Sequence, residues 1–479
     1  MKIILINPAS GLVKPLNRLI KFEPPVPPLG LASIAAVLRR EGVSVAVLDQ
    51  VANGFTNEKM LQYIIKSRPD IVAFSCLTTT MTNAAALIRD IKKKAGDIFI
   101  ILGNIHPTLF PEETIRGGLA DLVVRGEGEK TLVNLIKRIK RKEPYFDLKG
   151  ISFKSAKSIV HNPDEEPIEN LDELPFPEWS IFDLDKYSSC PMLMIKGRAL
   201  TIQASRGCPY RCFFCGQETM NKKVRTKHPM RLADEIEFFH KTLGVKYFGF
   251  IDAYFPLAEQ QGYDFAGELI RRGLHKKIKW FSETRVDKID YELLAALKKS
   301  GLYLMQYGFE SGNQQVLDNM NKMITLEQSR RAMAATKKAG IFSVGLFILG
   351  MPGETADTCR QTIRFARELD CDIAKFNIAT PYPGSRFFAQ YCDRLPKGIL
   401  TSRMTSWLDW SMGQNELVYS PEGLSCRDLV NMQRRAMYDF YVRPRMIFRH
   451  LAKQTIPFSQ LLFGGGLLVT KYLKSKFEN

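Results

Sequence analysis

The sequence predicts an α/β protein with a doubly wound, Rossmann-like N-terminal domain, a partial (βα)6 TIM-like barrel and a helical C-terminal region. Two observations predict this fold class. Short apolar, β-branched runs alternate with amphipathic helical patterns in two stretches of the chain, and a segment rich in proline and acidic residues lies between them. The expected boundaries are 1–145 for the first domain, 146–195 for a linker, 196–400 for the barrel and 401–479 for the C-terminal region.

In the N-terminal domain, the loops that follow the strand-like runs are candidate binding loops, because parallel sheets bind ligands beyond the carboxyl ends of their strands. Glycine there permits close backbone approach, and serine and threonine offer hydroxyl groups. No G-x-G-x-x-G pattern is present, which disfavours a dinucleotide, and ordinary polar turns would look the same. The expected strands are 2–7, 43–49, 70–75, 98–103 and 120–129, and the expected helices include 29–42 and 82–96.

The segment 158–187 lacks sustained periodicity. It is typical of a domain linker, and Phe176, Trp179 and Phe182 are expected to pack it down. It separates two regions with different patterns, so we place the domain boundary there.

Beyond residue 200, six strand-like runs are each followed by a helical pattern, such as 327–340. Six consecutive βα units fit a partial or complete barrel, whose active site lies at the carboxyl ends of the strands. The expected strands are 200–205, 246–252, 279–284, 303–309, 341–349 and 372–379.

The run SRGCPYRCFFCGQ, residues 205–217, places Cys208, Cys212 and Cys215 directly after the first barrel strand. A zinc site would need a fourth protein ligand, and the nearest histidine is His228. The flanking glycine, proline and arginine residues disfavour buried structural thiols. A 4Fe–4S cluster held by three thiolates leaves one iron open for a substrate or cofactor, and Phe214 could lie beside a bound purine.

This C-x3-C-x-aromatic-C pattern after the first strand of a βα barrel resembles the radical S-adenosylmethionine (SAM) superfamily. The resemblance implies that SAM chelates the open iron through its amino and carboxylate groups. It also implies that an electron from the cluster splits SAM and that the 5′-deoxyadenosyl radical removes a hydrogen atom from the substrate.

The family holds the rest of SAM on residues at successive strand ends. Each charged residue alone could be an ordinary rim salt bridge, but their recurrence at successive strand ends favours a site. Relatives often show two successive acids where this chain has one acid followed by Ala253. The resemblance implies SAM contacts at Phe214, Gly216, Asp252, Glu283, Arg285, Glu310, Ser311, Gly350 and Pro381, with Glu310 and Arg285 favoured over Asp252.

A doubly wound domain before such a barrel resembles the cobalamin-dependent class of this superfamily. The SCLTT segment is similar to the S-x-L segment that contacts the nucleotide tail, and LGNIHPT is similar to a Gly-Gly segment with Asn104 in place of the second glycine. The D-x-H-x-x-G motif that ligates cobalt is absent, so cobalamin is inferred from architecture. The implied cobalamin contacts are Asn7, Ser75, Leu77, Thr78, Gly103, Asn104, His106, Gly126 and Glu127; His106 could approach the corrin or simply form a hydrogen bond.

Six further cysteines lack tight spacing and are expected to be small buried residues. A second cluster from four of them is a weaker alternative. They are Cys76, Cys190, Cys359, Cys371, Cys392 and Cys426, of which the last four would form that second cluster.

The C-terminal region mixes basic with aromatic and aliphatic residues, and its apolar run 461–469 is too short to span a bilayer. It suits an interfacial helix, a lid over an apolar substrate or an ordinary helical cap on the barrel. The formal net charge of +18 allows an RNA role, but no dense basic run or nucleic-acid motif supports one.

The start MKIILINPAS does not resemble a secretory signal, and nine cysteines are too few for a disulfide framework. These observations indicate a cytoplasmic protein, with possible peripheral contact to the inner membrane face.

The resemblance lies closest to the branch with the anaerobic magnesium-protoporphyrin monomethyl ester cyclase and the hopanoid and bacteriochlorophyll methyltransferases. It implies three cofactors: a 4Fe–4S cluster, SAM and cobalamin. It also implies an external electron donor such as flavodoxin or ferredoxin. The leading hypothesis is methylation of an unactivated carbon of a large apolar substrate. The alternatives are a cyclisation or rearrangement without methyl transfer, and a non-catalytic sensor that binds the cluster and corrin.

Overall fold

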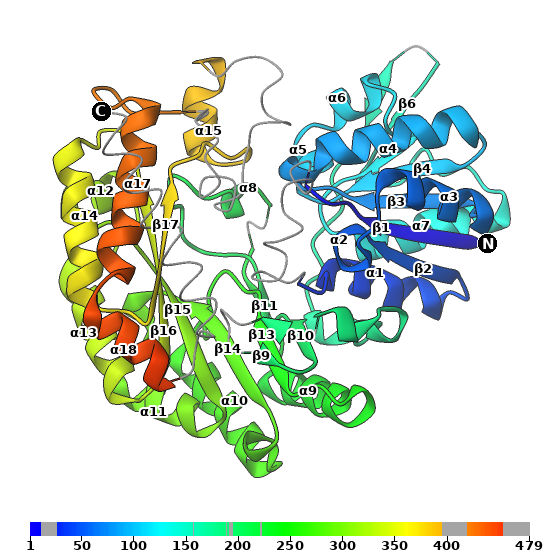
Figure 1. Cartoon of the computed structure of the whole chain (residues 1–479). Coiled ribbons are helices and arrows are strands. Elements are labelled where there is room, and N and C mark those ends of the chain that lie inside the picture. The colour runs from blue at the N-terminus through cyan, green and yellow to red at the C-terminus, as the bar shows by residue number, and fades with distance from the viewer. Residues whose placement is uncertain are drawn as a thin grey trace. The chain divides into compact units, whose positions relative to one another are not determined.

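The computed structural model describes residues 1–10, 26–156, 158–187, 189–190, 195–220, 223–394 and 419–453. The described residues form two compact units, Met1–Tyr187 and the residues that follow. Both are α/β units, as the sequence predicts, and each is described below by itself (Figure 1).

The first unit is built on a seven-stranded sheet with the strand order β2-β1-β3-β4-β5-β6-β7. Strands β1 to β5 are parallel, whereas β6 and β7 are antiparallel to their neighbours. The strand bounds are β1 Lys2–Asn7, β2 Ser44–Asp49, β3 Ile71–Ser75, β4 Phe99–Gly103, β5 Leu122–Val124, β6 Ile151–Lys154 and β7 Ile159–His161.

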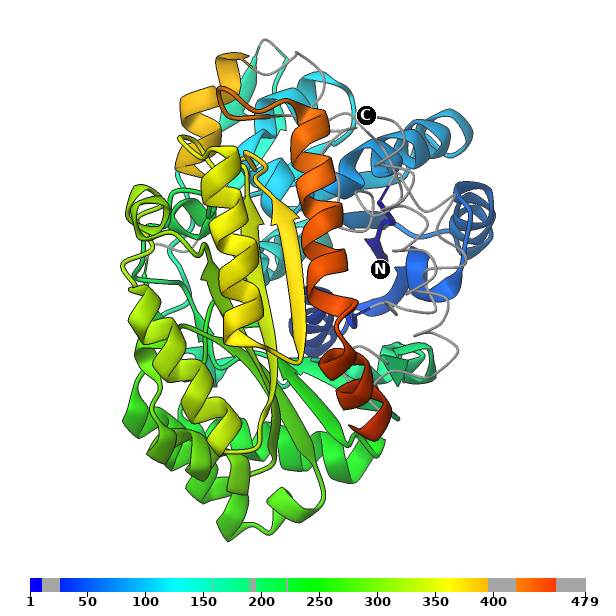
Figure 2. The same cartoon turned by 60° about the vertical axis from the view of Figure 1, so that its left-hand side comes forward.

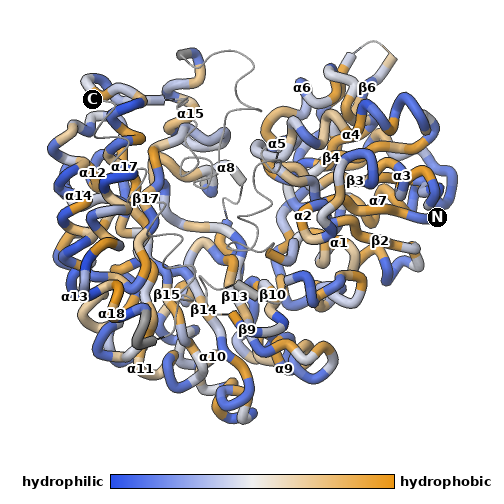
Figure 3. Tube along the Cα trace, in the orientation of Figure 1, coloured by the Kyte–Doolittle hydropathy of each residue, from blue (hydrophilic) through white to orange (hydrophobic). Residues whose placement is uncertain are grey.

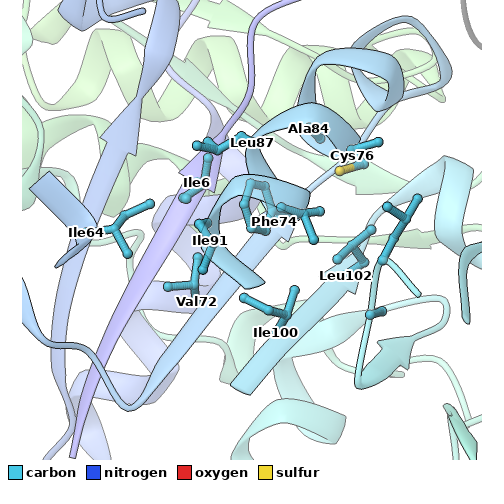
Figure 4. Close-up of a cluster of buried hydrophobic side chains, with 14 of the residues drawn as sticks. Ile6, Ile64, Val72, Phe74, Cys76, Ala84, Leu87, Ile91, Ile100 and Leu102 are labelled. Carbon is cyan, nitrogen blue, oxygen red and sulfur yellow. The ribbon is translucent and has the colours of Figure 1, made fainter. Parts of the chain in front are cut away.

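Helices accompany the parallel strands of this unit and bury one face each against the sheet. Figure 4 shows part of the resulting core, where Val72 and Phe74 of β3 meet Leu87 and Ile91 of α4. Burying each such side chain stabilises the unit by roughly 1.5–3 kcal/mol. The helices are α1 Leu29–Arg40, α2 Gln50–Asn53, α3 Asn57–Ser67, α4 Met81–Lys94, α5 Ile105–Leu109, α6 Pro111–Arg116 and α7 Gly128–Arg141.

Two sequence-based expectations for this unit are corrected. The expected strand 120–129 is reduced to the three residues of β5, because Gly126 takes a positive φ of 70° and α7 begins at Gly128. The expected linker is also not irregular throughout, because β6 and β7 extend the sheet and three short 3-10 helices follow. Trp179 and Phe182 pack down as expected, with ring centroids 5.3 Å apart.

The second unit contains a six-stranded parallel sheet in the sequential order β10-β13-β14-β15-β16-β17. This order is that of a partial (βα)6 barrel, as predicted. The strand bounds are β10 Ala199–Ile202, β13 Tyr247–Phe250, β14 Lys279–Thr284, β15 Leu302–Glu310, β16 Phe342–Leu349 and β17 Ile373–Ile378. Short two-stranded pairs join β8 Ser189–Cys190 to β9 Ile195–Lys196, and β11 Ser205–Arg206 to β12 Arg225–Thr226.

Helices line the outer side of this curved sheet (Figure 1), and Figure 3 shows hydrophilic residues recurring along them. Their starts carry side-chain caps, such as the reciprocal Thr325–Gln328 capping box of α13. The helices are α8 Gln217–Met220, α9 Pro229–Leu243, α10 Glu259–Arg271, α11 Tyr291–Lys299, α12 Gln314–Asn319, α13 Leu326–Lys338, α14 Ala356–Leu369 and α15 Arg386–Tyr391.

The described C-terminal residues form α17 Cys426–Tyr441 and α18 Pro444–Lys453, and α17 lies along strand β17 (Figure 2). The Tyr441 hydroxyl donates to the Ala374 carbonyl at 2.8 Å, and Gln433 donates to the Phe376 carbonyl at 2.7 Å. These side chains satisfy backbone groups on the free edge of the sheet, which would otherwise be open to another strand.

This arrangement agrees with the helical-cap alternative for α17 and α18. The apolar run 461–469 lies outside the described residues. In the described part of the chain, no helix is long and apolar enough to cross a membrane.

Candidate cluster and cofactor sites

The three cysteines lie on a loop between β11 and β12, beyond the carboxyl end of β10. Gly207 begins this loop with a positive φ of 98°. A Cβ atom there would stand 2.4 Å from the Lys223 carbonyl oxygen, so the two ends of the loop close together only because residue 207 is glycine.

Loops from later strands hold the cysteine loop from its other side. The Phe213 amide donates to the Met320 carbonyl at 2.8 Å, and the Phe387 amide donates to the Phe213 carbonyl at 2.9 Å. Gly216 lies against the loop after β17, since a Cβ atom there would be 3.4 Å from the Pro383 carbonyl oxygen. Residues distant in sequence therefore fix the backbone that carries the thiols.

The thiols of Cys212 and Cys215 are partly buried, and burial raises the pKa of each. Lys322 and Arg285 act on Cys212 in the opposite direction and favour its thiolate form. Within the described residues, no three His, Cys, Asp or Glu side chains already stand at metal-binding spacing. The three thiols do influence one another electrostatically, as expected for neighbours on one loop.

Two of the four cysteines proposed for a second cluster lie in the core of the second unit. Cys359 and Cys371 are fully buried, and the Cys371 sulfur lies 3.7 Å from the Met333 sulfur. Cys76 is likewise part of the hydrophobic core of the first unit.

A buried ion pair lies next to the cysteine loop. The Lys322 ammonium donates to Glu310 at 2.7 Å, and its nitrogen lies 5.8 Å from the centre of the Phe214 ring. Burial opposes the charge of Lys322, but Glu310 and Cys212 outweigh it and raise the pKa of the ammonium. A Cβ atom on Gly308 would be 2.5 Å from the Glu310 carboxylate, so this glycine leaves the space that the pair occupies.

Glu283, near the end of β14, is partly buried beside this pair. Burial and the negative charge of Glu310 raise the pKa of Glu283 to about 7, against the smaller lowering effects of Lys322 and Lys375. No described residue hydrogen-bonds its carboxyl group. Glu283 is therefore a carboxyl group with unused hydrogen-bonding capacity at the predicted end of the barrel.

Arg285 has a positioning role in this structure. It is buried, its Nε donates to Asp287 at 2.9 Å, and one terminal nitrogen donates to the Lys322 carbonyl at 2.9 Å. Its guanidinium carbon also lies 3.5 Å from the centre of the Tyr210 ring, two residues after the first cysteine. Arg285 thus connects the cysteine loop to the loop that carries Lys322.

Asp252 and Ser311 were expected to contact SAM, and the structure gives them other partners. Asp252 is buried and accepts hydrogen bonds from the Ala204 amide and the Ser205 hydroxyl, which ties β10 to β13. Burial raises its pKa to about 6. Ser311 is completely buried and bonds the Thr362 hydroxyl at 3.1 Å. Both side chains therefore have a structural role, because main-chain and hydroxyl groups of the barrel already bind their polar atoms.

The expected contacts Gly350 and Pro381 lie on loops after β16 and β17. Gly350 has a positive φ of 87°, and Glu354 accepts hydrogen bonds from the amides of Gly350 and Met351 at 2.7 and 2.8 Å. Burial raises the pKa of Glu354 to about 7. Glu354 therefore shapes the loop on which Gly350 lies, and Pro381 is buried in the next loop.

In the first unit, five of the expected contacts remain partly or largely exposed at the carboxyl ends of neighbouring strands. Ser75 ends β3 opposite Gly103 of β4, and Asn104 donates to the Ser75 hydroxyl at 2.9 Å. Leu77 is 46% exposed, and Gly126 follows β5. A Cβ atom on Gly103 would lie 3.5 Å from the Val124 carbonyl oxygen. This edge is neutral, polar and lined by little side-chain bulk.

The other expected contacts of this unit form hydrogen bonds with residues of the same unit. His106 is buried against Thr78, with 3.3 Å between its Nδ1 and the hydroxyl, and burial lowers its pKa to about 4. Asn7 donates to Asp49, and Glu127 accepts from the Ile168 amide. His106 thus forms the hydrogen bond of the second alternative, and its ring is enclosed.

These donor sets fit the expected cofactors. Three thiols on one loop, with no fourth metal ligand beside them among the described residues, suit a 4Fe–4S cluster with an open iron. The adjacent ammonium–carboxylate pair suits a zwitterionic amino-acid group. The neutral edge of the first unit suits a cobalamin tail that is held without a histidine ligand.

Comparison with known proteins identifies both units. Residues 18–136 match the B12 binding domain family, and residues 202–366 match the radical SAM superfamily. An uncharacterized methyltransferase of Pyrococcus horikoshii is 30% identical over 94% of this chain and 95% of its own length. The chain belongs to the radical SAM enzymes that carry a cobalamin-binding domain. The cofactors of this family are a 4Fe–4S cluster, SAM and cobalamin, as the sequence predicted.

Further relatives fall in the predicted branch. The anaerobic magnesium-protoporphyrin IX monomethyl ester cyclase of Rubrivivax gelatinosus is 32% identical over 77% of this chain and 67% of its own length. Among solved structures, the cobalamin-dependent SAM radical enzyme OxsB covers 95% of this chain with a TM-score of 0.73 at 19% identity. The radical SAM methyltransferase TsrM of Kitasatospora setae covers 93% with a TM-score of 0.71 at 19% identity, which supports the same fold.

Sequence reasoning did not single out three residues of this radical SAM barrel: Lys322, Tyr210 and Glu354. Lys322 follows a helix and lies outside every strand end, so its pattern gave no signal. Tyr210 lay inside the cysteine motif and could have been noticed as an aromatic partner for a cation. Glu354 belongs to the GMPGE run, whose two glycines indicate a tight loop that needs an anchor.

Proposed function

We propose that this radical SAM enzyme methylates an unactivated carbon of its substrate, with cobalamin as the methyl carrier. The observation that carries the proposal is the Glu310–Lys322 pair beside the three-cysteine loop, within a chain that also has a cobalamin-binding domain. A relative that spans almost the whole chain is named a methyltransferase, and the hopanoid C-3 methylase of Methylococcus capsulatus is 25% identical over 80% of the chain.

In this proposal, Cys208, Cys212 and Cys215 hold the cluster, which supplies the electron that cleaves SAM. Lys322 binds the carboxylate of SAM and Glu310 its ammonium group, because the two charges complement a zwitterion. Phe214 and Gly216 offer a flat, uncrowded surface to the rest of SAM. Arg285, Asp252 and Ser311 keep the loops in place, and an external one-electron donor such as flavodoxin or ferredoxin reduces the cluster.

The barrel interior supports an amphipathic substrate. The Phe281 ring lies against Gly249, since a Cβ atom on Gly249 would be 2.3 Å from that ring. Leu304 and Phe342 pack in the same hydrophobic cluster as Phe281. Nearer the carboxyl ends, β14 and β17 present the partly exposed side chains Glu283, Lys375 and Asn377, whereas their neighbours in the strands are buried. We infer a lipid, isoprenoid or tetrapyrrole-like skeleton with a polar group that reaches this layer.

Ring closure without methyl transfer is a second candidate, favoured by the 32% identical magnesium-protoporphyrin ester cyclase. The two reactions share the cluster, SAM and the buried pair. They differ in whether a carbon atom is added to the substrate, so only the product distinguishes them.

The test is anaerobic reconstitution with iron, sulfide and hydroxocobalamin, followed by reduction in the presence of SAM and candidate lipids or tetrapyrroles. Release of 5′-deoxyadenosine together with a product heavier by one CH2 group supports methyl transfer. A product that gains no carbon supports the cyclase instead. Bound cluster and corrin with no SAM cleavage under any of these conditions would favour the sensor.

A further inference from the structure

A basic pocket lies at the amino-terminal ends of the barrel strands, at the opposite end of the strands from the cysteine loop. It has a volume of about 330 Å³ and lies where β13, β14 and β15 begin. Its lining includes five lysines, Lys246, Lys276, Lys277, Lys279 and Lys298, together with His275, Tyr247 and Tyr303. None of these residues binds the cluster, SAM or cobalamin in the function proposed above.

Four of these lysines lack any acidic partner within the described residues. No described side chain forms an ion pair or hydrogen bond with the ammonium groups of Lys246, Lys276, Lys277 and Lys279. By contrast, the nearby Arg272 is paired with three acids, Asp234, Glu237 and Glu268. These four lysines therefore keep a concentrated positive charge around one cavity.

Helix ends account for only part of this charge. A cation in the last turn of a helix complements the negative end of the helix dipole, and Lys298 of α11 fits that explanation. Lys279 is instead the first residue of β14, and Lys246 directly precedes β13. Their convergence on the cavity therefore has no explanation in helix capping.

The remaining lining residues add aromatic surface and one more nitrogen. The Tyr247 and Tyr303 rings are 6.0 Å apart in an edge-on arrangement. The Nδ1 atom of His275 is buried and has no hydrogen-bond partner among the described residues. A cavity of this volume is within the range of small-molecule sites.

We propose that this pocket binds a phosphorylated ligand through a phosphate or pyrophosphate group. Ammonium groups are strong point-charge partners for phosphate oxygens, and several of them around one cavity match a group with more than one negative charge. The ligand would bind at the opposite strand ends from the radical chemistry. It would therefore make no direct contact with the cysteine loop.

Isothermal titration of the reconstituted full-length protein with inorganic pyrophosphate at physiological ionic strength tests the proposal. The informative variant is the double substitution Lys276→Gln with Lys277→Gln, because both side chains are exposed and their loss leaves the core unchanged. The matched control is Lys93→Gln with Lys94→Gln on α4, which removes the same charge from the other unit. Vesicles of phosphatidylcholine with and without phosphatidic acid form a second arm, since a lipid headgroup offers the same phosphate chemistry.

The expected result is saturable pyrophosphate binding by the wild type and the control, weakened on the order of tenfold in the Lys276/Lys277 variant. Vesicle binding that requires phosphatidic acid and is lost in the same variant would identify the phosphate as a lipid headgroup. Equal binding by all three proteins in both arms, or no binding in either arm, would overturn the proposal. SAM cleavage by each variant, measured alongside, checks that the radical SAM barrel is intact.

Discussion

At the carboxyl ends of its strands, the cobalamin-binding unit carries small neutral groups, whereas the same ends of the radical SAM barrel carry buried charges. Ser75 and Asn104 hydrogen-bond each other at an open edge, and the one histidine nearby is enclosed. In the barrel, Glu310 and Lys322 are buried and paired with each other, and the buried Arg285 is paired with Asp287.

The difference follows from what each edge is expected to hold. A zwitterionic ligand such as SAM repays the desolvation of fixed charges, because it replaces water with oriented partners. A large nucleotide tail needs room and hydrogen bonds instead. Substitutions in the barrel should therefore have large effects and those in the first unit small ones, and the following predictions test that order.

The largest effect is expected for Cys212→Ala. Removal of one thiol from a three-thiol site should abolish assembly of a SAM-binding cluster and all 5′-deoxyadenosine formation. Iron and sulfide content, visible absorbance and a dithionite–SAM cleavage assay measure this. Cys392→Ala, at a half-buried cysteine outside the motif, is the control and should retain both properties. Full SAM cleavage by the reconstituted Cys212 variant would sink the assignment of the cluster.

The next largest effect is expected for Lys322→Met, which leaves Glu310 buried without its cation. Such a change costs roughly 3–5 kcal/mol of folding stability. The double variant Lys322→Met with Glu310→Gln should recover much of the thermal stability but not SAM affinity. Equilibrium binding of SAM and thermal unfolding separate the two effects. If the double variant binds SAM as tightly as the wild type, the pair has only a structural role.

Gly207→Ala should disturb the cysteine loop by backbone strain. The positive φ and the 2.4 Å approach to the Lys223 carbonyl leave no room for a methyl group, at a cost of about 1–3 kcal/mol. The amount of iron incorporated on reconstitution should fall. Gly267→Ala, within α10, is the matched control because a Cβ atom there meets nothing within 4 Å. Equal iron content in the two variants would show that the loop tolerates the strain.

Glu283 should make stability depend on pH between its ordinary pKa of 4.5 and about 7. In that window the folded protein binds more protons at Glu283 than the unfolded chain does, so this residue lowers stability as the pH rises. Glu283→Gln removes this titration. The stability of the variant relative to the wild type should therefore be greater at pH 8 than at pH 5. Urea unfolding at both values measures the difference. A constant difference would mean that Glu283 titrates as in the unfolded chain.

The smallest effect is expected in the first unit, for Ser75→Ala. It removes one hydroxyl from an exposed edge, which is worth about 0.5–1.5 kcal/mol of corrin binding. Equilibrium dialysis with hydroxocobalamin checks this, with Ser44→Ala at the opposite end of the sheet as the control. If Ser75→Ala weakened corrin binding as strongly as Lys322→Met weakens SAM binding, the two edges would not differ in the way described.

Much of this protein was predictable because local sequence patterns report local physics. Five of the six barrel strands appear within two residues of their expected bounds, since a buried parallel strand must be a short apolar run. The first, expected at 200–205, ends three residues early at Ile202. The three cysteines on a loop after β10, and the family with its cofactors, follow from spacing that is written in the chain. The expected strand 120–129 was too long because its apolar run ends at Val124 and Gly126 then turns the backbone.

The tertiary structure alone decided which polar residues are available to a ligand. Nothing in the sequence distinguishes Ser75, which stays at an open edge, from Ser311, which is enclosed by Thr362 from a helix 51 residues away. Lys322 becomes a candidate site residue only because the fold places it beside Glu310 and Phe214. Burial and partner choice are properties of long-range packing, and a local pattern carries no information about which distant residue will arrive beside it.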